Sequence, residues 1–176
     1  MTDGAGRAIR PARPDEASSL ALLSLEVWSH TYLRDGVSGR FADYALSTFT
    51  GASYARIITD PRERLLVSDN QRGLDGLIRV TRGNPGPVAG CSDIEITSLY
   101  VQPRHHGRGI GSALLRAGMG VAVSMGAASV WLTVNVQNAG ALGFYRAHGF
   151  ESLGQTAFKI DGKAYPNEVL RCPLPA

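Results

Sequence analysis

The fold is decided by the stretch Leu99-Tyr100-Val101-Gln102-Pro103-Arg104-His105-His106-Gly107-Arg108-Gly109-Ile110-Gly111-Ser112. Residues 92–101 favour a β-strand because they are rich in β-branched and aromatic side chains, and Pro103 ends that strand. Beyond the glycines, apolar residues recur at helical spacing through 109–125, and residues 129–135 have the composition of a buried strand. The stretch therefore predicts a central βαβ unit whose two strands are parallel.

The alternate glycines Gly107, Gly109 and Gly111 predict a turn that binds an anion. The first residues of a helix carry unpaired N–H groups at the positive end of its dipole, and glycine leaves room for a phosphate to approach them. A dinucleotide fingerprint fits less well because Ser112 replaces its third glycine, and a nucleotide P-loop would need a lysine. The alternative is that these glycines only form a tight turn.

The rest of the chain predicts one mixed α/β domain at residues 7–176, preceded by a flexible tail at 1–6. Further strands are expected at 8–11, 64–68, 77–81, 150–160 and 164–174. Helices are expected at 15–33, 41–49, 53–59 and 138–148. The segment 69–76 is interpreted as a turn-rich connection, and Asp161-Gly162 as the turn of a final hairpin.

Composition and charge exclude several classes of protein. The 176 residues carry a net charge of +3 without a run of basic and aromatic residues, which argues against nucleic-acid binding. No stretch has the roughly 18 continuous apolar residues of a membrane span. The polar segment 1–13 has no apolar signal-peptide region, which favours a cytoplasmic protein. Neither the spacing of Cys91 and Cys172 nor the adjacent pair His105-His106 fits a metal site, so we predict no metal.

Two blocks of this sequence resemble the GNAT superfamily of acetyl-CoA-dependent N-acetyltransferases. The first is the stretch quoted above with Ala113-Leu114-Leu115, and the second is Asn138-Ala139-Gly140-Ala141-Leu142-Gly143-Phe144-Tyr145 with Gly149-Phe150. Their order and separation fit the family, and the specific resemblance covers residues 92–174. One departure is His106, where the family usually has Gln or Arg; we expect this position to act mainly through its backbone.

The resemblance implies a mixed, mostly antiparallel sheet of six to seven strands with a central parallel βαβ unit and flanking helices. It also implies that acetyl-CoA, the cosubstrate, binds where the two parallel strands splay apart. The pantetheine arm would pair with one strand edge and the pyrophosphate with the glycine loop. The cofactor-binding residues implied are Leu99, Val101, His106, Gly107, Arg108, Gly109, Gly111, Ser112 and Asn138. Asn138 also suits a helix N-cap, and both roles are compatible.

The resemblance makes Tyr145 the catalytic acid that reprotonates the departing thiolate. A phenol, with a pKa of about 10, stays protonated at neutral pH. Glu95 is expected to accept the proton of the amine or to hold a cationic substrate. The alternatives are a core aromatic for Tyr145 and a solvated surface carboxylate for Glu95. Glu95, Thr97 and Leu99 would share one face of an ideal strand, unless a bulge breaks the alternation.

The acceptor pocket is expected between the first two helices, the loop 83–93 and the last hairpin, with Trp28, Tyr32 and Tyr165 as candidate lining residues. Core packing is the alternative for all three. The predicted activity is acetyl transfer to a primary amine of a small molecule by direct attack in a ternary complex. A protein or peptide N-acetyltransferase and a non-catalytic acyl-CoA-binding module are the alternatives, and the resemblance adds a homodimer as a partner.

Overall fold

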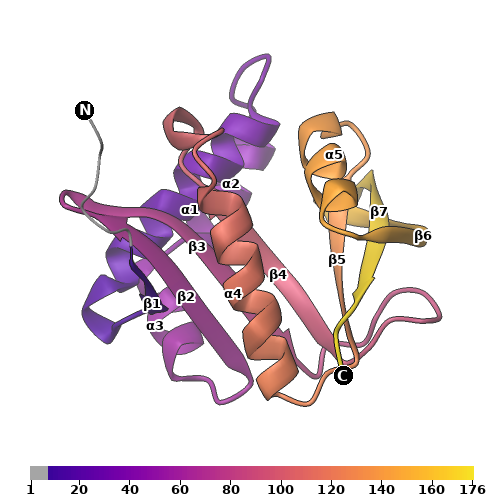
Figure 1. Cartoon of the computed structure of the whole chain (residues 1–176). Coiled ribbons are helices and arrows are strands. Elements are labelled where there is room, and N and C mark those ends of the chain that lie inside the picture. The colour runs from indigo at the N-terminus through magenta and orange to yellow at the C-terminus, as the bar shows by residue number, and fades with distance from the viewer. Residues whose placement is uncertain (1–7) are drawn as a thin grey trace.

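The computed structural model describes residues 8–176, so the tail expected at 1–6 and the first expected domain residue lie outside the described residues. The described chain forms one seven-stranded sheet in the spatial order β1-β2-β3-β4-β5-β7-β6 (Figure 1). Neighbouring strands are antiparallel except for β4 and β5, which are parallel. The predicted mixed sheet with a central parallel βαβ unit is confirmed. The strands are β1 Ala8–Pro11, β2 Glu63–Asn70, β3 Gly73–Arg82, β4 Ile94–Val101, β5 Ser129–Asn135, β6 Glu151–Ile160 and β7 Lys163–Pro173.

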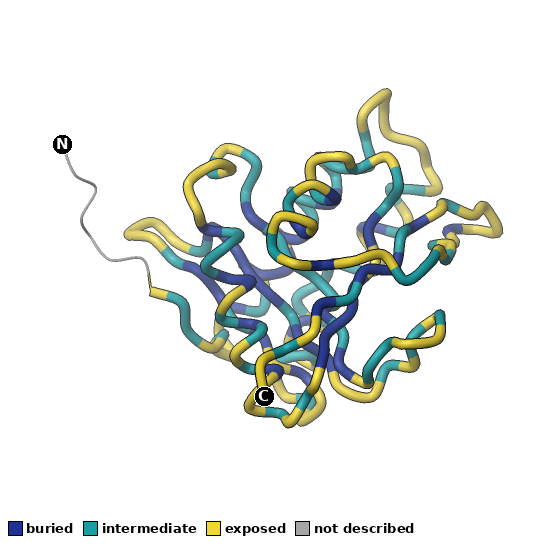
Figure 2. Tube along the Cα trace, turned by 45° about the vertical axis from the view of Figure 1, so that its right-hand side comes forward, coloured by how far each residue is buried: buried dark blue, intermediate teal, exposed yellow. Residues whose placement is uncertain are grey.

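Helices cover both faces of the β1–β4 half of the sheet. The covering helices are α1 Ala17–Tyr32 and α3 Gly51–Thr59 on one face and α4 Ile110–Ser124 on the other. Helix α2 Gly39–Thr48 packs against α1 and β6, and α5 Ala139–Ala147 lies beside β5 and β7 (Figure 1). Consecutive strand residues point to opposite faces, so Ile78 joins the core cluster of α4 while Leu77 joins that of α1 and α3. Burial is concentrated along the strands and the inner helix faces (Figure 2). The predicted helices and strands are all present, with ends that differ by a few residues.

The largest difference from prediction lies in the β2–β3 hairpin, where the turn-rich connection expected at 69–76 is wrong. The strands continue to Asn70 and restart at Gly73, so Gly76 lies inside β3. A Cβ atom at Gly76 would lie 2.8 Å from Cδ1 of Leu114 and 3.1 Å from the carbonyl oxygen of Tyr100. The lack of a side chain at Gly76 therefore allows α4 to pack closely on the sheet, and this glycine does not form a turn.

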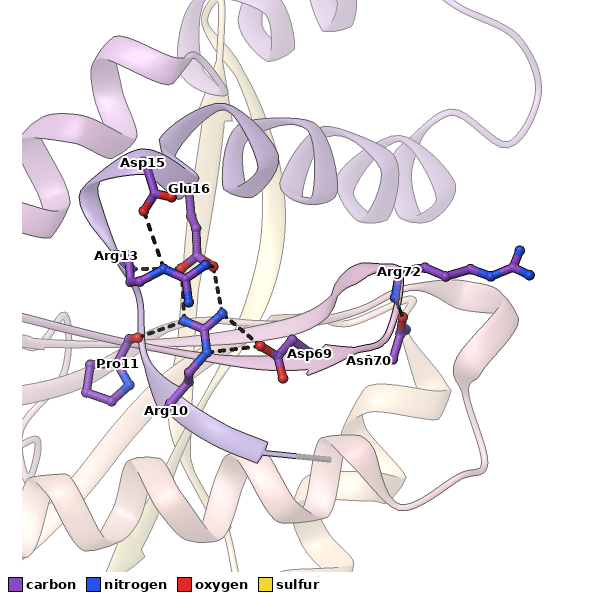
Figure 3. Close-up of polar contacts among 8 residues, drawn as sticks. All are labelled: Arg10, Pro11, Arg13, Asp15, Glu16, Asp69, Asn70 and Arg72. Atoms are coloured by element: carbon purple, nitrogen blue, oxygen red, sulfur yellow. Dashed lines mark hydrogen bonds and ion pairs between the residues drawn. The ribbon is translucent and has the colours of Figure 1, made fainter. Parts of the chain in front are cut away.

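The first strand is held by a partly buried ionic cluster that the sequence did not predict (Figure 3). The guanidinium of Arg10 bonds Glu16 at 2.7 Å and Asp69 of β2 at 2.8 Å. The Arg13 amide also donates to Glu16. The hydrogen bond from Arg10 lowers the pKa of the Glu16 carboxyl against the opposing effect of burial. The cluster ties the start of α1 and the edge strand β1 to the β2–β3 hairpin.

The two parallel strands β4 and β5 diverge from one another along the sheet (Figure 1). Their only paired residues are Glu95 and Trp131, close to one end of each strand. Beyond this point, β5 is paired with β7 on its far side, whereas β4 is paired with β3. The sheet therefore consists of two halves whose facing edges are free over most of their length.

A β-bulge at Thr97 breaks the alternation along β4. Arg79 pairs with Ser98, but the next residue, Val80, pairs with Ile96, so Thr97 has no partner in the register. An extra residue shifts all later side chains to the other face. As a result Leu99 joins the core under α4, whereas Glu95 lies on the opposite face, beside Thr81. The ideal alternation therefore does not hold.

Candidate active site

One large cleft of about 1630 Å³ occupies the gap between β4 and β5 and extends toward α1, α2 and α3. Its walls come from segments that are far apart in the sequence. The expected site residues that line it are Trp28, Tyr32, Glu95, Leu99, Val101, His106, Gly107, Gly109, Gly111, Ser112, Asn138 and Tyr145. Arg108 and Tyr165 are not lining residues. The arrangement brings the expected cofactor loop, acid and base to a single cavity.

The glycine loop forms an anion cradle at the start of α4. Gly107 and Gly109 have φ values of 75° and 77°, a conformation that favours glycine. The first helical bond is donated by the Ala113 amide to the Gly109 carbonyl. Within residues 8–176, the six amides of 107–112 donate to no other group. Nothing lies within 4 Å of a Cβ built at Gly107 or Gly109, so a phosphate has access to these donors.

The edge of β4 that faces the cleft carries backbone groups that pair with no other strand of the described chain beyond Glu95. The Gln102 amide donates to the Asp75 carbonyl of β3 at 3.0 Å. Because successive residues turn their backbone groups to opposite edges, those of Leu99 and Val101 face the cleft. The Val101 carbonyl there contacts Nε2 of His106 at 3.0 Å. We expected His106 to act mainly through its backbone, but its side chain also contacts the edge of β4 that faces the cleft.

Asn138 is the N-cap of α5, the alternative role expected for it. Its side-chain oxygen accepts a hydrogen bond from the Ala141 amide at 3.1 Å. This bond satisfies one of the free donors at the helix start and holds the side chain at the edge of the cleft. The cap and a contact with a bound ligand are compatible.

Tyr145 combines core packing with a place in the cleft. Its ring packs edge-on against Phe144 and Phe150, with centroids 5.2 and 5.4 Å away. Burial raises the pKa of its hydroxyl. In the described part of the chain, that hydroxyl has no hydrogen-bond partner. Tyr145 is therefore a protonated donor at neutral pH whose hydroxyl is free to bind a ligand.

Glu95 is a half-buried carboxylate rather than a solvated surface residue. Burial raises its pKa, and a hydrogen bond from Asn84 works in the opposite direction. The Asn84 amide nitrogen lies 2.6 Å from Oε2 of Glu95. A carboxylate with a raised pKa is better suited to accept a proton. Asn84 belongs to the connection between β3 and β4, and no sequence motif marked it.

An aromatic wall lines the end of the cleft beside α1. Trp28 stacks on Tyr32 with ring centroids 4.9 Å apart and also contacts Tyr44. Tyr44 and Phe158, which the sequence did not single out, line the cleft as well. Tyr165 packs against Phe41, at 5.6 Å, away from the lining. The expected loop 83–93 contributes no lining residue and reaches the site through Asn84 alone.

The two thiols lie outside the cleft. Cys91 and Cys172 are free thiols, and neither lines it. Among residues 8–176, no three His, Cys, Asp or Glu side chains gather as a metal site would require.

In the same range, every helix is too short or too polar to cross a membrane.

Comparison with known proteins identifies the family. Residues 25–150 match the Acetyltransferase (GNAT) family. An uncharacterised N-acetyltransferase of Mycobacterium tuberculosis is 31% identical over 119 residues, which cover 68% of this chain and 72% of that protein. The chain therefore belongs to the GNAT family of acetyltransferases. It is an acetyl-CoA-dependent N-acetyltransferase, as its sequence predicted.

Two further relatives extend over nearly the whole chain. Streptothricin acetyltransferase of Streptomyces lavendulae is 27% identical over 186 residues, covering 95% of this chain and 93% of its own. The structure of PaiA N-acetyltransferase from Thermoplasma acidophilum, solved with coenzyme A, superposes with a TM-score of 0.74 at 19% identity. It covers 96% of this chain and 99% of its own, and it supports the fold.

Proposed function

We propose that this enzyme acetylates a primary amine of a small molecule by direct attack within a ternary complex. The observation that carries the proposal is the convergence of the amide cradle, Glu95 and Tyr145 on one cleft. The aromatic wall around Trp28 supports a small acceptor, because pockets for small molecules are lined mostly by apolar and aromatic groups. A relative that is similar over 93% of its length is named for acetylating streptothricin, a small molecule.

The residues present fit the cosubstrate. Acetyl-CoA supplies an activated acetyl thioester. The free amides of 107–112 and the open space around Gly107 and Gly109 suit its pyrophosphate. The cleft-facing backbone groups of Leu99 and Val101 suit the amides of its pantetheine arm, which would pair as an added strand. His106, Ser112 and Asn138 line the same region, and exposed Arg108 would contribute through its amide.

Two side chains carry the proton transfers in this proposal. Glu95 takes the proton of the attacking amine at its carboxylate, directly or through water. Tyr145 gives its hydroxyl proton to the departing sulfur. Direct attack of the amine on the thioester needs no acetylated enzyme, and neither cysteine lines the cleft. The roles of Trp28 and Tyr32 are contacts with the body of the acceptor.

Two alternative functions differ from the proposed one, the first in the amine that is acetylated and the second in having no catalytic turnover. A protein or peptide acceptor would use the open side of the cleft, and a non-catalytic acyl-CoA-binding module would need neither Glu95 nor Tyr145. A cytoplasmic location and a homodimer are further parts of the proposal, and the homodimer rests on the family resemblance.

A thiol-release assay with acetyl-CoA tests the proposal. The panel contains streptothricin, spermidine, 2-phenylethylamine and a peptide with a free N-terminal glycine. We expect thiol release to depend on one or more of the small amines and the product to be an amide. Release with the peptide alone would establish the protein-directed alternative. Binding of coenzyme A without release for any amine would establish the non-catalytic one.

A further inference from the structure

A chain of hydrogen bonds runs from the cleft into the sheet beside Glu95. The hydroxyls of Thr97 and Thr81 are 2.5 Å apart, and the Thr81 hydroxyl donates to Oε2 of Glu63 at 2.8 Å. Arg79 holds both oxygens of Glu63, at 2.6 and 2.9 Å. Thr81 is 2% exposed, whereas Thr97 is partly exposed and lines the cleft. Glu63 and Arg79 also line the cleft, so Thr81 is the buried link between them and Thr97.

The direction of this chain follows from its chemistry. Glu63 is bound at both oxygens by a guanidinium, so it is a carboxylate and can only accept hydrogen bonds. Thr81 has one hydroxyl proton, and it is given to Glu63. The proton in the short contact between the threonines must therefore come from Thr97. Thr97 consequently has no proton left for the cleft and presents only oxygen lone pairs there.

The bulge brings this acceptor next to the proposed base. Glu95 and Thr97 precede the point where β4 changes faces, so both lie on the face of α1 and α3. Thr81 pairs with Glu95 in the sheet register and bonds Thr97 through its side chain. Two hydrogen-bond acceptors, the carboxylate of Glu95 and the polarised hydroxyl of Thr97, therefore lie on one face of β4 and line the same cleft.

We propose that Thr97, oriented by Thr81 and Glu63, selects an acceptor whose reacting nitrogen carries two N–H bonds. This inference rests on the proposed function. A primary amine gives one N–H to Glu95 and the other to Thr97, and its lone pair stays free to attack. In the transfer a C–N bond forms and the C–S bond breaks. One amine proton passes to Glu95 and the sulfur takes one from Tyr145, while Thr97 only accepts a hydrogen bond.

The same geometry disfavours other nucleophiles. A hydroxyl group has one proton for two acceptors, so its lone pairs would face those of Thr97. A secondary amine has lost one of its two N–H bonds, and its methyl group would displace a polar contact. Thr97 is thus a specificity-determining residue, and Thr81, which is buried, is a positioning residue that acts through it.

The test compares Thr97→Val and Thr81→Val with the wild type. The substrates are the panel amine with the highest turnover and its N-methyl derivative. Valine at 97 removes the acceptor, and valine at 81 frees the Thr97 proton to turn toward the cleft. We expect each variant to lower kcat/KM for the primary amine about 10-fold, mainly through KM, since that factor corresponds to one hydrogen bond. Preference over the N-methyl derivative should fall by a similar factor.

Controls separate this role from a general loss of structure. Thr97→Ser and Thr81→Ser keep the hydroxyls and should behave like the wild type. Thr133 is a cleft-lining threonine of β5 that takes no part in these hydrogen bonds, so Thr133→Val should leave the preference for the primary amine intact. The double valine variant should be no worse than either single one, because both remove the same interaction. Coenzyme A affinity, followed by thermal shift, should be unchanged in every variant.

The outcomes distinguish this inference from the proposed function. A wild type inert toward every amine overturns the proposed function and this inference with it. An active wild type with unchanged selectivity in Thr81→Val overturns only the assignment of Thr97. Additive losses in the double valine variant would also overturn it, because they would mean two independent contacts.

Discussion

At the scale of the residue, the site depends on how burial and single hydrogen bonds adjust two ionisable side chains. Burial raises the pKa of both Tyr145 and Glu95, which keeps the phenol protonated and makes the carboxylate more basic. The first shift ensures that Tyr145 holds a proton before the transfer, and the second increases the affinity of Glu95 for the proton of the amine. Both residues therefore lend themselves to direct kinetic tests.

Replacing Tyr145 with Phe tests the proposed acid. The phenyl ring keeps the packing against Phe144 and Phe150, so we expect coenzyme A affinity and melting temperature close to the wild type. Turnover should fall roughly 100-fold, the scale of losing one positioned proton donor. Steady-state kinetics measures the turnover, and thermal unfolding at increasing coenzyme A concentrations measures the melting temperature and the affinity. Unchanged turnover would remove Tyr145 from the mechanism.

Replacing Asn84 with Ala tests the environment of Glu95 through pH. The Asn84 amide lowers the pKa of this carboxyl, so its loss should raise that pKa further. A base is active in its ionised form, so the acidic limb of the kcat/KM profile should move to higher pH in the variant. The alkaline limb should not move. Glu95→Gln should abolish the acidic limb, and a profile of unchanged shape in both variants would contradict the assignment.

At the scale of the element, helix α4 links the cradle to the sheet through small residues. Gly76 of β3 and Gly118 of α4 lie in the contact between them. A Cβ atom at Gly118 would lie 2.4 Å from Cδ1 of fully buried Ile78. Such an approach allows the helix to lie close to the strands, and its N-terminus therefore reaches the mouth of the cleft.

Alanine at Gly118 and at Gly120 separates packing from helix propensity. Both substitutions favour the helix by up to about 1 kcal/mol, but only position 118 is crowded, since nothing lies within 4 Å of a Cβ at Gly120. We expect Gly120→Ala to stabilise the protein and Gly118→Ala to be about 1–3 kcal/mol less stable than Gly120→Ala, the usual effect of overpacking. Urea unfolding measures the difference. Equal stabilities would refute the tight contact.

At the scale of the whole molecule, the two halves of the sheet share one pair of residues in the ladder, Glu95 and Trp131. Helix α4 leads from β4 across the first half and returns to β5. A ligand bound along the free edge of β4 and at the start of α4 would fill the space between the halves. Ligand binding and global stability should therefore be linked.

Coenzyme A at about 100 times its Kd should stabilise the wild type by about 2.7 kcal/mol, which corresponds to a rise of roughly 5–10 °C in Tm. Gly109→Asp should lose most of this rise, because it places a carboxylate where the phosphate binds. Gly126→Asp is the matched control, since Gly126 has a φ of 81°, close to the 77° of Gly109, but follows the C-terminal end of α4. A full shift in Gly109→Asp would contradict the cradle.

The sequence alone determined the strand–loop–helix unit, the cradle glycines and the hairpin turn at Asp161-Gly162, because these depend on dihedral preferences and hydrogen bonds between residues close in the chain. Only the tertiary structure decided that Asn84 bonds Glu95, that Thr81 orients Thr97, and that Arg108 and Tyr165 lie off the cleft lining. The contact of Thr81 with Thr97 depends on strand register, and that register changes at a bulge that the amino-acid type of Thr97 does not predict. A one-residue shift reverses which side chains face the cleft, so this part of the site depends on how the assembled sheet packs.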